Sequence, residues 1–132
     1  MNNINNNINN NIKKIQNLIT LDNIITICKI IAIYVLTFLT FYEIEQKKLR
    51  LIYASIIYLI SIYLFNIKWT LAILYICIAI ACVITESLYV TFCKDTWVYK
   101  TPDIINIPYW LLPLWSIAFL LMIELINIVK KI

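Results

Sequence analysis

The chain has 132 residues, of which 63% are hydrophobic and only 14% charged, with a net charge of +4 and a mean hydropathy of +0.86. A soluble domain is about 45–50% apolar and about 25% charged, so this chain has too few polar side chains to cover its apolar ones in water. The composition excludes an ordinary soluble domain, and the modest, dispersed charge gives no reason to expect a nucleic-acid partner.

The N-terminal part divides into two segments. Residues 1–11 are almost entirely asparagine and isoleucine, a low-complexity composition that predicts a disordered Asn-rich tail. In 12–22, apolar residues recur on one helical face with Lys13 and Lys14 opposite, which predicts an interfacial amphipathic helix. Asp22 is then expected to cap the first membrane-spanning helix.

Four apolar runs follow, at 24–42, 49–65, 69–93 and 109–129. Each is long enough to cross a bilayer, since a span needs about 20 apolar residues, with a range of about 17–25. In lipid each run must be helical to satisfy its own backbone hydrogen bonds. We therefore expect an all-α fold: a membrane-embedded bundle of four transmembrane helices formed by 23–132, with the second and third spans joined as an antiparallel hairpin.

Four spans would place both termini on one side of the membrane. The cations on that side are Lys13, Lys14, Lys29, Lys68, Lys130 and Lys131, and those on the other side are Lys47, Lys48, Arg50, Lys94 and Lys100. Cytoplasmic loops carry an excess of lysine and arginine, so this small difference favours cytoplasmic termini.

Glu86 is the most informative single residue, because a carboxylate within a span is costly and is a candidate functional site. It precedes Cys93 by seven residues, about 10 Å along the helix axis, toward the side away from the termini. Glu86 is the candidate catalytic residue, and the candidate binding residues expected at its level are Tyr89, Trp97, Tyr99, Lys100, Tyr109 and Trp110.

Two interpretations of Glu86 remain open. It could serve a headgroup or ion site, or act as an acid or base beside a fourth span that Pro113 kinks, with the Tyr109 carbonyl left free. It could instead accept a hydrogen bond from a tyrosine or serine and fix helix packing. One carboxylate without a second acid, a histidine or a nucleophile is weak evidence for catalysis.

Other polar residues have structural interpretations. We expect Lys29, Glu124 and Lys130 to form a structural ion pair on the side of the termini. The four cysteines, Cys28, Cys77, Cys82 and Cys93, are expected as buried thiols, and no metal or cofactor is expected, since the chain lacks histidine and a C-x-x-C pair. The stripe Cys77, Ala81 and Thr85 predicts close helix packing.

The segment from Glu86 through Trp97-x-Tyr99 to Ile107-Pro108-Tyr109-Trp110 and Pro113-x-Trp115 resembles small multi-pass membrane proteins, themselves uncharacterised, of large DNA viruses of amoebae or of AT-rich protists. A viral origin would imply a host or virion membrane. More distantly, the same thirty or so residues are similar to carotenoid hydratase and cyclase membrane proteins, but they lack that family's glycines and further acids.

The sequence thus predicts an integral membrane protein with membrane lipids, and a second copy or another membrane protein, as its partners. A structural or interaction component of a membrane is the leading hypothesis for its function. A lipid- or isoprenoid-acting enzyme using Glu86 is the first alternative, and a small oligomeric channel or transporter is the second.

Overall fold

The computed structural model describes residues 20–93, 98–99 and 102–130. In that part of the chain the helices are α2 (Leu21–Glu43), α3 (Lys47–Leu64), α4 (Trp69–Phe92) and α5 (Leu111–Lys130). The described residues form no strand beyond an isolated bridge in the α4–α5 connection, so the all-α prediction is confirmed. The predicted tail and most of the predicted interfacial helix fall in 1–19, outside the described residues.

The N-terminus of α2 is capped by Thr20, so the prediction of Asp22 as the capping residue is wrong. The Thr20 hydroxyl accepts from the backbone N–H of Asn23 at 3.4 Å. Asp22 lies in the first turn of α2, where a carboxylate still interacts favourably with the positive end of the helix dipole. Thr20 is the capping residue because it directly precedes the first helical residue, Leu21, whereas Asp22 already lies within the helix.

The link between α3 and α4 shows how the chain turns without glycine. Asn66 takes the left-handed conformation with φ 52°, which asparagine tolerates better than most residues. The Asn66 N–H donates to the Tyr63 carbonyl at 3.1 Å, and the Ile67 N–H donates to the Ile62 carbonyl at 2.9 Å. This pair of bonds is a Schellman motif, and it ends α3 at Leu64.

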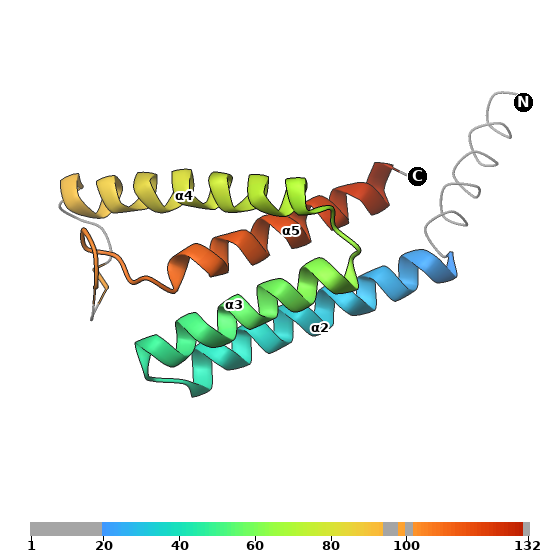
Figure 1. Cartoon of the computed structure of the whole chain (residues 1–132), viewed down its shortest axis with the longest axis horizontal. Coiled ribbons are helices and arrows are strands. Elements are labelled where there is room, and N and C mark those ends of the chain that lie inside the picture. The colour runs from blue at the N-terminus through green and yellow to red at the C-terminus, as the bar shows by residue number, and fades with distance from the viewer. Residues whose placement is uncertain (1–19, 94–97, 100–101, 131–132) are drawn as a thin grey trace, which may run out of the picture.

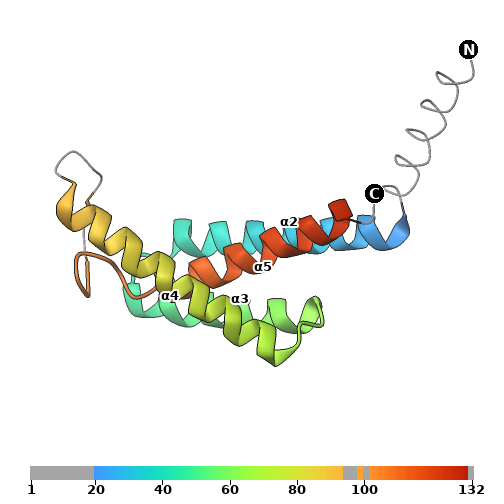
Figure 2. The ribbon, with the colours of Figure 1, turned by 90° about the horizontal axis from the view of Figure 1, so that it is seen from above.

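Helix α5 lies at the centre of the bundle. It packs against α4, α3 and α2, and α2 in turn packs along α3 (Figure 1). Successive helices alternate in direction, so α2 begins and α5 ends at the same end of the bundle (Figures 1 and 2). Helices α3 and α4 run antiparallel as predicted, but they hardly contact each other, and α4 packs mainly against α5 (Figure 1).

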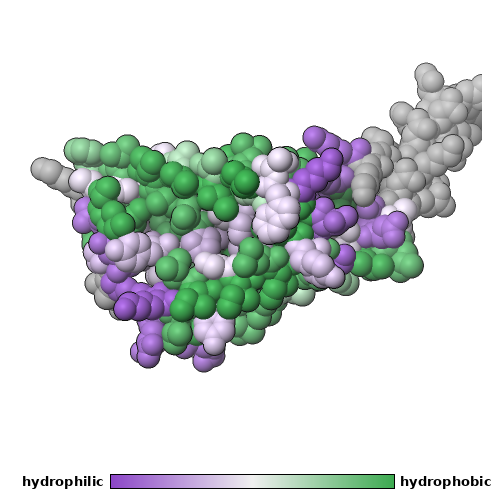
Figure 3. Space-filling model, viewed as in Figure 1, coloured by the Kyte–Doolittle hydropathy of each residue, from purple (hydrophilic) through white to green (hydrophobic). Residues whose placement is uncertain are grey.

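Three of these helices, α2, α4 and α5, are long and apolar enough to cross a membrane. The fourth, α3, has 18 residues and carries Lys47, Lys48 and Arg50 in its first turn, so its charge exceeds that of a typical span. Figure 3 shows apolar residues along the middle of the bundle and hydrophilic residues toward its two ends, the pattern of a surface that meets lipid between two polar layers.

Most of the least exposed side chains between the helices are small. Ala54 on α3 and Ala79 on α4 are both 0% exposed, as are Ser61 and Leu120, and Ser116 on α5 is 1% exposed. Small residues let helix backbones approach, which matters in lipid because apolar burial alone does not drive helices together there. Larger side chains complete the core: Ile30, Ile33, Ile57, Tyr58, Ile62, Tyr75, Ile117 and Leu121.

Two packing predictions are wrong. The stripe of Cys77, Ala81 and Thr85 faces outward, and α4 instead buries Ala72, Tyr75, Ala79 and Ser87. The cysteines are also not buried: Cys28, Cys77 and Cys93 are exposed and Cys82 is half-buried. Both errors have one cause, since a membrane-facing helix surface tolerates small apolar groups as readily as a core does.

Candidate functional site

Glu86 joins three parts of the chain. Its Oε2 atom accepts from the Trp115 indole N–H at 3.0 Å, and its Oε1 atom accepts from the Tyr99 hydroxyl. Trp115 stands on α5, and Tyr99 stands in the connection between α4 and α5. The carboxylate is half-buried and each of its oxygens has a donor, so it ties α4 to α5 and to the segment above them.

Aromatic rings surround this carboxylate on the side away from the termini. The Tyr99 ring meets the Trp110 ring edge-on, with centroids 6.1 Å apart and planes at 84°. Trp110 also contacts Phe41 at the end of α2, with centroids 4.8 Å apart, and the Arg50 guanidinium lies 5.8 Å from its ring centroid. Trp110 therefore links the Glu86 cluster to α2 and α3 through ring and cation–π contacts.

An ion pair fastens the α4–α5 connection to α3. The Lys47 ammonium lies 2.8 Å from Asp103 Oδ1 and 3.4 Å from the Pro102 carbonyl. Asp103 Oδ2 accepts from the Tyr109 backbone N–H at 3.1 Å. The hydrogen bond from Lys47 and, to a lesser degree, that from the Tyr109 N–H lower the pKa of Asp103 below its ordinary value. The Asp103 carboxylate thus binds both α3, through Lys47, and the segment that precedes α5, through Tyr109.

A tight turn at 104–107 lies against α4. Ile104 and Ile107 exchange backbone hydrogen bonds of 3.0 and 2.9 Å, and the two residues between them, Ile105 and Asn106, have φ angles of 43° and 65°. Two positive φ angles between paired residues are the pattern of a type I′ turn, which favours asparagine and glycine. The Ile105 carbonyl accepts from the Ser87 hydroxyl at 2.6 Å, so the turn is fastened to α4.

Ile105 is the strained residue of this turn, because a β-branched side chain is unfavourable in the left-handed region. Ile105→Asn should therefore raise the free energy of unfolding by about 1 kcal/mol. The measurement is the unfolding midpoint of the purified protein in a mild detergent. The matched control is Asn106→Gly, which should change the midpoint less because asparagine already tolerates its φ angle. A lower midpoint for Ile105→Asn would contradict the strain assignment.

The beginning of α5 differs from the prediction. The helix starts at Leu111, so Pro113 lies in its first turn, where a missing N–H leaves no hydrogen bond unmade. The Tyr109 carbonyl is not free, since it accepts from the Leu112 N–H at 3.4 Å, and the Pro108 carbonyl accepts from Leu111 at 3.2 Å. The predicted proline kink is wrong because the helix begins later than the apolar run.

The structure connects two of the candidate binding residues to Glu86, Tyr99 directly and Trp110 through Tyr99. The side chains of Tyr89 and Tyr109, in contrast, are 49% and 53% exposed. The other two candidates, Trp97 and Lys100, lie outside the described residues.

Trp115 is the Glu86 partner that sequence reasoning missed. A depth comparison could have found it, because Trp115 follows the start of α5 by four residues and Glu86 precedes the end of α4 by six. At about 1.5 Å per residue these positions fall at similar levels of an antiparallel pair. An indole N–H at that level also needs an acceptor.

The polar residues on the side of the termini form a separate group. The Lys29 ammonium donates to the Leu64 carbonyl at 3.0 Å, which places a cation on the exposed carbonyls at the C-terminal end of α3. Glu124 and Lys130 lie on α5, and Glu124 is close enough to Tyr75 of α4 to interact electrostatically with it. The ion pair of Lys29, Glu124 and Lys130 stays a prediction.

The chemistry available to the Glu86 cluster is that of a hydrogen-bond acceptor. No group of three His, Cys, Asp or Glu side chains that could hold a metal ion occurs in 20–93, 98–99 and 102–130. Four cavities of about 410, 330, 200 and 610 Å³ are present in the described structure, and Glu86 lines none of these four. The carboxylate lies in a closed set of contacts and not on the wall of one of these cavities.

Comparisons with protein-family models, with curated proteins and with solved structures found no match to this chain. The functional argument therefore depends on the geometry of this chain alone.

Proposed function

We propose that this chain is a multi-pass integral membrane protein of four spans that serves as a structural or interaction component of a membrane. Support comes from α2, α4 and α5, which are long and apolar enough to cross a bilayer. The helix α3 is the proposed fourth span. It packs along α2 and against α5, and a three-residue link joins it to α2, so it follows α2 through the bilayer.

The charges of α3 are compatible with a span because all three lie in its first turn. Lysine and arginine near a helix end can extend their side chains to the headgroup layer. The rest of α3 is apolar apart from two serines and three tyrosine hydroxyls. Both serine hydroxyls donate to carbonyls of the same helix, at 2.8 Å for Ser55 and 2.7 Å for Ser61. We propose that the start of α2 and the end of α5 lie on the cytoplasmic side.

The observation that carries the structural role is the hydrogen bonding of Glu86. Both carboxylate oxygens accept from donors on other parts of the chain, Tyr99 and Trp115. A catalytic acid or base needs access to a substrate atom at hydrogen-bond distance. An acceptor whose oxygens hold an indole and a phenol instead fixes the position of α5 and of the α4–α5 connection. This supports a packing role over an enzymatic one.

Labelling of single cysteines from one side of sealed vesicles tests the four-span proposal. In a protein whose four native cysteines are replaced by serine, the variants are Glu45→Cys in the α2–α3 link, Asn66→Cys in the α3–α4 link and Asn106→Cys in the α4–α5 connection. Four spans predict that Glu45→Cys and Asn106→Cys react with an impermeant maleimide from the same side, and Asn66→Cys from the other.

Detergent-opened vesicles are the control, in which all three variants should react. If Glu45→Cys and Asn66→Cys react from the same side of sealed vesicles, α3 does not cross the membrane and the four-span proposal fails. Failure of all three variants to remain with the membrane pellet after alkaline extraction would overturn the proposal of an integral membrane protein.

A further inference from the structure

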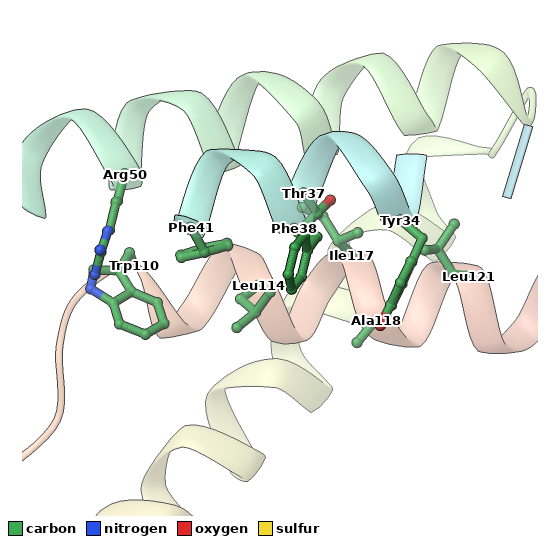
Figure 4. A pocket seen from close by; sticks show the side chains of 10 residues that line it. All are labelled: Tyr34, Thr37, Phe38, Phe41, Arg50, Trp110, Leu114, Ile117, Ala118 and Leu121. Atoms are coloured by element: carbon green, nitrogen blue, oxygen red, sulfur yellow. The ribbon is translucent and has the colours of Figure 1, made fainter. Parts of the chain in front are cut away.

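One of the cavities of the described structure is a groove between α2 and α5. It has a volume of about 410 Å³ and lies open to the surroundings of the bundle. Figure 4 shows its walls: Tyr34, Phe38 and Phe41 from α2 face Leu114, Ala118 and Leu121 from α5. Nearly all of this lining is apolar, and the one charged side chain in it is Arg50 from α3.

The groove has the length of one leaflet. It runs from Trp110, beside Arg50, to Leu121 on α5, roughly 16 Å at about 1.5 Å per residue. The hydrocarbon core of a bilayer is about 30 Å thick, so this distance reaches from the headgroup level to the midplane. Arg50 and Trp110 lie at one end of the groove in Figure 4, and Tyr34 and Leu121 lie at the other.

Arg50 is positioned to bind an anion at the mouth of the groove. Its Nε atom donates to the Ile44 carbonyl and its guanidinium lies 5.8 Å from the Trp110 ring centroid, so the side chain is held in place. No described carboxylate lies within ion-pair distance of it, and the ion pair made by this first turn of α3 joins Lys47 to Asp103. A guanidinium fixed in this way presents its remaining N–H groups to a phosphate.

Two acidic residues near this mouth must be weighed. Glu43 and Glu45 are exposed at the end of α2 and in the α2–α3 link, but neither lines the groove. Lys48 lies in the same turn of α3 as Arg50 and is also exposed outside the groove. The charge that faces the cavity is therefore positive, although the surrounding surface is mixed.

We propose that this groove binds one anionic glycerophospholipid of the leaflet opposite the termini, with an acyl chain between α2 and α5 and the phosphate on Arg50. The inference depends on the proposed membrane insertion and adds a specific lipid site to it. An apolar channel of leaflet length with a single cation at its headgroup end matches both parts of such a lipid.

Lipid binding to the purified full-length protein in detergent tests this site. Dioleoyl-phosphatidylglycerol and dioleoyl-phosphatidylcholine, which share their acyl chains, are titrated separately and the bound lipid is counted by native mass spectrometry. We expect the anionic lipid to bind about ten-fold more tightly, because the choline ammonium of the other lipid offsets the phosphate charge that Arg50 meets. Arg50→Gln should remove this preference, and Arg50→Lys should retain part of it.

Two matched controls make the assignment specific. Lys48→Gln removes a cation from the same turn outside the groove and should keep the preference. Ala118→Phe fills the groove and should weaken binding of both lipids, whereas Ala81→Phe, at an exposed position on α4, should not. The Ala118→Phe measurement also keeps the test decisive if Arg50→Gln does not fold.

Equal binding of the two lipids by the unmodified protein would overturn the proposal. So would a preference that survives Arg50→Gln or disappears equally with Lys48→Gln. A dimer that excludes the anionic lipid from the groove would assign the groove to a second copy instead. Cysteine labelling separates the lipid-site proposal from the four-span proposal. If labelling supports four spans but the protein shows no lipid preference, only the lipid site is rejected.

Discussion

Replacing Glu86 with leucine is expected to lower the free energy of unfolding of the bundle by about 2–3 kcal/mol. Leucine fills a similar volume but leaves the Trp115 indole N–H and the Tyr99 hydroxyl without their acceptor. A buried donor that loses its partner costs about 1–3 kcal/mol, and the half-buried position of Glu86 keeps the expected sum near the low end. The measurement is the unfolding midpoint in detergent, with circular dichroism as the probe of helix loss.

Two variants accompany this measurement. Glu86→Gln retains a carbonyl oxygen for Trp115 and an amide that can donate to the Tyr99 oxygen, so it should cost less than about 1 kcal/mol. Glu43→Leu removes an exposed carboxylate from the end of α2 and should change stability by no more than about 0.5 kcal/mol. A Glu86→Leu protein as stable as the unmodified one would show that the carboxylate does not hold the bundle together.

The same variants separate the structural role from catalysis. A carboxylate that acts as an acid or base would lose its activity in Glu86→Gln while the protein stayed folded and inserted. The structural account predicts instead that stability falls in the order unmodified protein, Glu86→Gln, Glu86→Leu, because the number of accepted hydrogen bonds falls in that order.

The second large effect is expected from Ala79→Leu, which should destabilise the bundle by about 2 kcal/mol. Ala79 is 0% exposed on α4, and the main contact of that helix is with α5. Three additional carbon atoms at this position force the helices apart or into strained rotamers. In lipid this loss of packing is not offset by apolar burial elsewhere, since lipid tails are as apolar as leucine.

Ala81→Leu is the matched control, because it makes the same change two residues along on the exposed face of α4. It should leave the unfolding midpoint within about 0.5 kcal/mol of the unmodified protein. If the two variants lost the same stability, the face that α4 presents to α5 would be assigned wrongly.

The all-helical fold and the depth of Glu86 along its helix could be predicted from the sequence, because both depend only on the order of residues along the chain. Runs of apolar residues determine where helices lie, and a rise of about 1.5 Å per residue determines depth. The interaction of Glu86 with Tyr99 follows from such reasoning, since the aromatic connection must lie above a carboxylate on that side. Helix ends were less predictable, as Thr20 and the late start of α5 show.

The face that each helix buries could not be predicted in the same way. In water, apolar residues indicate the buried face, but in a membrane both faces of α4 are apolar, and small residues occur on each. Ala79 and Ala81 are therefore equivalent in the sequence and differ only in the fold. The left-handed conformation of Ile105 could not be predicted either, because the chain has no glycine to indicate a turn.

A double-mutant cycle between Glu86 and Trp115 tests most directly whether the carboxylate joins α4 to α5. The unfolding free energies of Glu86→Leu, Trp115→Phe and the double variant are compared with that of the unmodified protein, all in the same detergent. The account predicts a coupling energy of at least about 1 kcal/mol, because each single variant removes the same hydrogen bond. Effects that add to within about 0.5 kcal/mol would contradict it.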